Sequence, residues 1–306
     1  MQINEELLLE WFKEQGLIKG ENIPRKGDQS LFENEKNRIK KILSEEVYDV
    51  FKENRVVLAG GAITSLFTNA IINDLDIYFK DKNGFCKVIH EAYSNEWVNG
   101  FNQLRVNHTT DRSILCSGEH DIKIQLIVYK LFPTINDIFN AFDFTINMGA
   151  YDFETESFVF HEDFFKHNAQ RYIDFNPKTD YPLISAMRVQ KYVERGYTIS
   201  KAQMLRILLA VNNKNIDSWE VFVDEVSGMY GLEPGEIFDM EKSISVEEAI
   251  TQLDKVFLPG KHYEKNIPQD KRKLFEKYPH LLTDNVVMWM EENKNKMPWE
   301  LNELPF

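Results

Sequence analysis

The sequence predicts an α+β fold, with a mixed β-sheet and flanking helices followed by an all-helical C-terminal region. Two observations support this fold class. Short apolar runs of strand length alternate with helical segments up to about residue 175, and from residue 181 onward apolar residues recur at helical spacing. We therefore divide the 306 residues into N-terminal helices that pack on a sheet domain (1–52), the sheet domain itself (53–176) and a helical region (177–306).

The elements follow in order along the chain. Amphipathic spacing predicts helices at 5–18 and 29–52, with a glycine- and proline-containing loop at 20–27 between them. In the sheet domain we expect helices at 62–67, 84–97 and 134–141, and strands at 55–59, 74–79, 104–107, 113–116 and 121–129. Further helices are predicted at 183–195, 201–211, 219–226, 246–256 and 270–277.

Composition excludes several classes of protein. No apolar run approaches the roughly 18 to 20 residues of a membrane span, and the acidic N-terminus does not resemble a secretion signal, so we expect a soluble cytoplasmic protein. Two cysteines cannot build a disulfide framework or a thiolate zinc site. The net charge of −13 disfavours binding to long nucleic acids, which usually relies on a basic surface.

The segment Asp74-Leu75-Asp76 is the main candidate for chemistry. Alternate side chains of a strand project from the same face, so the two carboxylates should lie together and favour a bound cation, Mg²⁺ or Mn²⁺. Upstream, Gly60 and Gly61 stand between a predicted strand and a predicted helix, where glycine lets backbone N–H groups approach a phosphate. Each motif alone is common, but their combination in this order is much rarer.

This order of motifs resembles the signature of the DNA polymerase β-type nucleotidyltransferase superfamily, in which a glycine pair, a helix and an Asp-x-Asp strand follow one another. The segment from Phe142 to Asp152 is similar to the Arg-Arg-Asp-Phe-Thr-Ile-Asn-Ala block of tRNA CCA-adding enzymes and bacterial poly(A) polymerases. Residues 188–199 are similar to the neck helix of that family. The resemblance covers residues 55–200 and fits a divergent, phage-type member.

The sequence also departs from that family. Ala141 and Phe142 replace the tandem arginines that contact the triphosphate, and no copy of the acidic motif that selects the base is found. Gln125 occupies the expected place of a third carboxylate, so this acid is Asp121, Asp143 or absent, and we prefer Asp143. The candidate cations for the triphosphate are then Arg105, Arg112, Lys123 and Arg188.

The resemblance implies a metal-dependent enzyme that transfers NMP from ATP or another NTP to a hydroxyl. The acceptor it implies is an RNA 3′ end of the tRNA or poly(A) type; a protein or small-molecule hydroxyl is the alternative, and a degenerate protein that only binds a nucleotide or partner is a third reading. The sequence names neither the preferred NTP nor the oligomeric state. The implied metal ligands are Asp74 and Asp76, the implied catalytic residues are Asp74, Asp76 and Asp143, and the implied nucleotide-binding residues are Gly60, Gly61, Thr64, Ser65, Asn147, Arg188 and Lys191.

Overall fold

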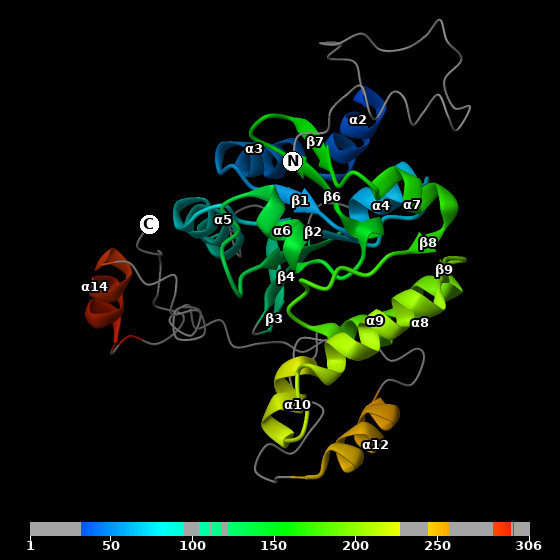
Figure 1. Cartoon of the computed structure of the whole chain (residues 1–306). Coiled ribbons are helices and arrows are strands. Elements are labelled where there is room, and N and C mark those ends of the chain that lie inside the picture. The colour runs from blue at the N-terminus through cyan, green and yellow to red at the C-terminus, as the bar shows by residue number, and fades with distance from the viewer. Residues whose placement is uncertain are drawn as a thin grey trace, which may run out of the picture.

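The computed structural model confirms the predicted α+β fold, with a mixed sheet and a mainly helical C-terminal part (Figure 1). The structure describes residues 32–94, 104–110, 112–117, 122–226, 244–256, 284–294 and 296. Four sequence-based expectations lie outside these residues: the helix at 5–18, the loop at 20–27, the helix at 270–277 and the candidate acid Asp121.

Seven strands form the central sheet in the order β3-β4-β5-β2-β1-β6-β7. They are β1 (Val57–Ala59), β2 (Asp74–Tyr78), β3 (Arg105–Thr109), β4 (Ser113–Ser117), β5 (Lys123–Ile127), β6 (Gly149–Asp152) and β7 (Ser157–Phe160). Only β2 and β5 run parallel to each other, and the other neighbouring pairs are antiparallel. The sheet is therefore mixed, as predicted.

Helices cover the two faces of this sheet unequally. One face packs against α2 (Glu33–Ile42), α3 (Glu45–Glu53), α4 (Gly61–Phe67), α5 (Lys82–Ser94) and α7 (Phe164–Gln170). On the opposite face, α6 (Ile135–Ala141) contributes Ile138 and Phe139 to a smaller core with Val57 and Ala59. The strand period of two explains the division, because Leu58 points into the larger core while its neighbours point into the smaller one.

Capping residues set several helix boundaries. The helix predicted at 29–52 is two helices, because Ser44 has an extended backbone and its hydroxyl accepts a hydrogen bond from the Val47 amide, which starts α3 afresh. At α6, Thr134 and Asp137 form a capping box, so the predicted helix begins one residue later than expected. At Ser44, the cap divides a segment whose apolar spacing alone predicts one continuous helix.

Several elements near the helical part were not predicted. Helix α7 follows β7, and the 3₁₀-helix η2 (Thr145–Asn147) interrupts the apolar segment after α6. Strand β8 (Tyr172–Ile173) pairs in parallel with β9 (Thr198–Ile199), so the region beyond residue 177 is not purely helical. The elements η2, β8 and β9 have only two or three residues, too few to leave a periodic signal in the sequence.

The C-terminal helices begin with α8 (Pro182–Glu194) and α9 (Lys201–Asn212), which pack together below the sheet in Figure 1. They are followed by α10 (Trp219–Val226), α12 (Val246–Val256) and α14 (Asp284–Asn293). Pro182 occupies the first turn of α8, where its missing N–H is tolerated, and the Ser200 hydroxyl caps α9. Within the described residues, no helix is both long and apolar enough to cross a membrane.

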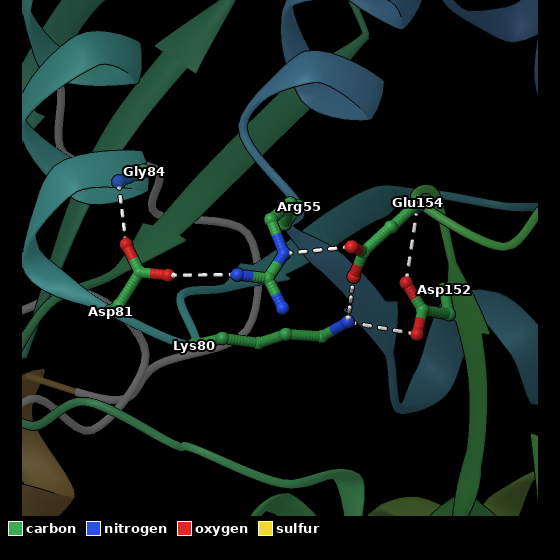
Figure 2. A network of polar contacts seen from close by, with 6 residues as sticks. All are labelled: Arg55, Lys80, Asp81, Gly84, Asp152 and Glu154. Atoms are coloured by element: carbon green, nitrogen blue, oxygen red, sulfur yellow. Dashed lines mark hydrogen bonds and ion pairs between the residues drawn. The ribbon is translucent and has the colours of Figure 1, made fainter.

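A polar network ties the end of β2 to the turn between β6 and β7 (Figure 2). The Lys80 ammonium group lies 2.8 Å from Asp152 Oδ2 and 3.3 Å from Glu154 Oε2. Arg55 bridges Glu154 and Asp81, and the Asp81 carboxylate accepts a hydrogen bond from the Gly84 amide at the start of α5. This network stabilises the end of β2 that lies away from Asp74.

Candidate active site

The two aspartates of β2 lie on the same face of the sheet as α6. Leu75 and Ile77 are buried in the larger core, so Asp74 and Asp76 project to the other side with Tyr78. Asp74 is exposed and Asp76 is half-buried. The predicted juxtaposition of the two carboxylates thus follows directly from the strand they occupy.

Gly60 brings the end of β1 close to this pair. Its φ of +92° and ψ of −141° lie in a region that only glycine adopts readily. A Cβ atom at Gly60 would lie 3.5 Å from Asp76 Oδ2 and 3.4 Å from the ring of Phe142. A Cβ atom at Gly61 would have no such neighbour within 4 Å. Gly60 thus lies in contact distance of Asp76, and the open space beside Gly61 is where a ligand can approach the turn.

The electrostatics of Asp76 favour a bound cation. Burial and, next, the charge of Asp74 raise the pKa of Asp76 to about 7, while Arg188 and Lys191 act in the opposite direction. A divalent ion bound between the two carboxylates would remove the repulsion that raises this pKa. An all-oxygen set of donors suits Mg²⁺ or Mn²⁺, so the residues present fit such an ion.

Helix α8 supplies the cations that face the aspartates. Arg188 and Lys191 are three residues apart and lie on the same side of the helix. Burial, together with repulsion from Arg188 and Arg195, lowers the pKa of Lys191, and Asp74 and Asp76 oppose this effect. The predicted carboxylates and the predicted α8 cations, which are more than 100 positions apart in the sequence, thus lie close enough for their charges to interact.

Asp143 is the partner of Arg188. Its side chain is only 4% exposed, and its Oδ2 lies 2.9 Å from a guanidinium nitrogen of Arg188. Burial by itself would lower the pKa of Arg188, but the charge of Asp143 and the contact with Tyr192 outweigh it and raise that pKa. Among the described residues, no three acidic, histidine or cysteine side chains are grouped as a metal site, and the catalytic role predicted for Asp143 stays a prediction.

Tyr192 connects Arg188 to Asn147, and sequence reasoning gave it no role in the site. The buried Tyr192 hydroxyl lies 3.1 Å from Arg188 Nη2 and contacts both amide atoms of Asn147, at 2.8 and 3.0 Å. Its position four residues after Arg188, on the same helix face, was the available signal. Asn147 is held in η2, which is fixed in turn by a 2.7 Å contact between Thr145 Oγ1 and His167 Nδ1.

Other predicted residues lie differently. The Thr64 hydroxyl is buried and donates to the Ile146 carbonyl at 2.7 Å, so it is engaged within the fold, whereas Ser65 is partly exposed on α4. Arg112 stacks on Tyr181 with its guanidinium 3.5 Å from the ring centre. Lys123 is exposed and stands beside Asp74 in the register of β5 and β2, and the side chain of Arg105 lies outside the described part of the structure.

Among solved structures, CCA-adding enzymes are similar to this chain in fold. A complex of a CCA-adding enzyme with CTP has 14% sequence identity and a TM-score of 0.44, covering 85% of this chain and 62% of the other. The Thermotoga maritima CCA-adding enzyme complexed with tRNA gives 13% and 0.41, with the same coverages. At 13% and 14% identity, this likeness concerns the fold alone, and the site is defined by the residues described above.

Comparison of sequences gives a second result. A family model described as "Gad2: Gabija anti-defense 2 family protein" matches residues 31–171, which include β1, β2, β5 and Asp143. A protein named "Gabija anti-defense 2" from Bacillus phage SPbetaL7 is 39% identical over 236 residues, which is 76% of this chain. In sequence, this chain is therefore similar to a phage anti-defence protein, of whose length it spans 57%.

Proposed function

We propose that this chain is a metal-dependent nucleotidyltransferase that moves an NMP group from an NTP to an acceptor hydroxyl, and that this activity counters the Gabija defence. The observation that carries the proposal is the pair Asp74 and Asp76, which lie beside the glycine turn Gly60-Gly61 and within the electrostatic reach of Arg188 and Lys191 of α8. The relative's name supplies the biological context.

The residues divide the work of the reaction. Asp74 and Asp76 would hold Mg²⁺ or Mn²⁺, which when bound would neutralise the triphosphate and lower the pKa of the attacking hydroxyl. Arg188 and Lys191 would contact the phosphates that leave as pyrophosphate. The acceptor oxygen forms a bond to the α-phosphorus, the bond from that phosphorus to the bridging oxygen of pyrophosphate breaks, and the hydroxyl proton passes to solvent.

Asp143, Tyr192 and Asn147 have a different part in this proposal. Asp143 and Tyr192 hold the guanidinium of Arg188 by the ion pair and the hydroxyl contact, and Asn147 holds the Tyr192 hydroxyl in turn. Asp143 is thus proposed as a positioning residue rather than as a third metal ligand. Such support fixes the direction in which Arg188 meets the phosphates.

The acceptor is proposed to be an RNA 3′ end, in line with the resemblance to CCA-adding enzymes and their neck helix. A protein hydroxyl is the second candidate, and two observations favour it. The chain carries a net charge of −13, and Phe142 stands where the family has a phosphate-binding arginine. Its ring packs 5.8 Å from that of Tyr78, so this side of the site is apolar.

The test is incorporation of label from each α-labelled NTP in the presence of Mg²⁺ or Mn²⁺, with tRNA, total RNA and an extract of Gabija-expressing cells as acceptors. Asp74→Ala and Asp76→Ala should abolish incorporation, while Asp217→Ala, at an exposed aspartate between α9 and α10, should leave it unchanged. Labelled RNA supports the first acceptor and labelled protein the second. Full incorporation by either site variant would refute the assignment, and NTP binding without any incorporation would indicate a degenerate binding protein.

A further inference from the structure

The strand next to Asp76 carries a carboxamide at the metal site. β2 and β5 are parallel, and Asp76 is paired in register with Gln125. Residues paired across neighbouring strands project their side chains from the same face, about 5 Å apart. The Gln125 side chain therefore lies beside the Asp76 carboxylate at the metal site of the proposed function, on which this inference rests.

Ser113 fixes the orientation of that carboxamide. Gln125 Nε2 donates a hydrogen bond of 2.8 Å to Ser113 Oγ on β4, the neighbour of β5 on the side away from β2. Ser113 is itself 4% exposed, and its hydroxyl lies 3.3 Å from Thr110 Oγ1, to which it can donate. Because the amide nitrogen is held toward β4, the amide oxygen is presented on the side of β2.

The amide oxygen of Gln125 has no competing partner within the described ranges, where no residue donates a hydrogen bond to it. Asp143, the other candidate for a third oxygen donor, is held by Arg188 at 2.9 Å. Amide oxygens are ordinary ligands of hard divalent cations, although they carry no charge. The donor set on this face is thus two carboxylates and one carboxamide.

We propose that Gln125 Oε1 is the third protein ligand of the divalent ion held by Asp74 and Asp76. A neutral third ligand leaves the site with two negative charges instead of three, in a region that already contains the cations Lys123, Arg188 and Lys191. The protein alone then binds the ion weakly, and the triphosphate supplies the missing negative charge when ion and nucleotide arrive together.

The test measures binding of Mn²⁺ alone to the full chain, by electron paramagnetic resonance of the free ion and without any nucleotide. Gln125→Glu, which keeps the shape and adds a charge, should tighten binding by roughly tenfold, and Gln125→Leu should weaken it by roughly tenfold. Asn83→Asp adds the same charge at an exposed position on α5, on the opposite face of the sheet, and should change nothing.

The outcomes separate this inference from the function on which it rests. Unchanged Mn²⁺ affinity in Gln125→Glu overturns the role of Gln125, provided that Asp76→Ala abolishes binding. Mn²⁺ binding that survives in both Asp74→Ala and Asp76→Ala instead refutes the metal site of the proposed function. Circular dichroism checks the fold of each variant, and if Gln125→Leu does not fold, the isosteric glutamate variant alone decides.

Discussion

The ion pair between Asp143 and Arg188 offers the sharpest test of how the site is built. Asp143 is 4% exposed and Arg188 is 34% exposed, and the atoms of the pair are 2.9 Å apart. Arg188 also contacts the Tyr192 hydroxyl, so replacing either charged residue leaves a mostly buried partner without its neutralising group. A double-mutant cycle of Asp143→Ala and Arg188→Ala measures how strongly the two side chains depend on each other.

The expected magnitude follows from burial. Removing one member of a fully buried pair costs about 3–5 kcal/mol, because the remaining charge is left in a poorly solvated place. Since about a third of Arg188 reaches solvent, we expect about 2 kcal/mol for each single variant and a coupling of about 1–2 kcal/mol. Asp143→Ala should also raise KM for the NTP more than it lowers kcat, because Arg188 loses its orientation.

Urea unfolding, followed by circular dichroism, provides the free energies of the four proteins in the cycle. Lys130 and Asp180 form a suitable control pair, since their atoms are 2.8 Å apart but their side chains are 41% and 48% exposed. An exposed pair should show a coupling of about 0.5 kcal/mol or less. If the Asp143 and Arg188 cycle gives no more coupling than this control, the proposed positioning role of Asp143 is refuted.

Three further variants test other parts of the structure. Lys80→Met should destabilise the protein by about 2 kcal/mol, measured by urea unfolding, because Asp152 loses its closest cation; a neutral result would show that this network does not stabilise the fold. Hydrogen bonds from Lys52, then Tyr48, lower the pKa of Glu156 to about 2, so its contribution to stability is complete above pH 4.5 and is lost as the pH falls toward 2. Glu156→Gln should therefore flatten the pH dependence of thermal unfolding in this range, and an unchanged profile would contradict the assignment. Gly60→Ala should cost about 1–3 kcal/mol of stability through its positive φ and should reduce nucleotidyl transfer, whereas wild-type stability and activity would show that the close approach is not required.

The main features of the fold were predictable because they are local. The strand, glycine turn, helix and Asp-x-Asp strand lie within 24 positions, from residue 55 to residue 78, and each has a periodic or compositional signal. The break at Ser44 and the short elements η2, β8 and β9 were missed, since a cap or a two-residue pairing depends on contacts that apolar spacing does not record.

The site was predictable only in part, for a similar reason. Asp74 and Asp76 share a strand face, which follows from their spacing, and the structure places Arg188 and Lys191 near them. Asp143 lies in a loop and Arg188 lies in a helix 45 positions later, so no local sequence pattern predicts that they form an ion pair. The metal and nucleotide roles of these residues stay predictions until the variants above are measured.

The charges around the carboxylates also bear on the acceptor. Among the described residues, the charges of Asp74, Asp76 and Asp143 are matched in number by those of Lys123, Arg188 and Lys191, so the proposed triphosphate and its ion would use the cations at this site. Three other cations of the described residues are already engaged, since Arg112 stacks on Tyr181 and both Lys130 and Lys214 contact Asp180. Gripping several phosphates of a long RNA requires free lysines and arginines, and affinity then falls steeply with salt. We therefore expect the proposed acceptor to be held by shape and by a few hydrogen bonds, which suits a short RNA end or a protein hydroxyl better than an extended RNA backbone.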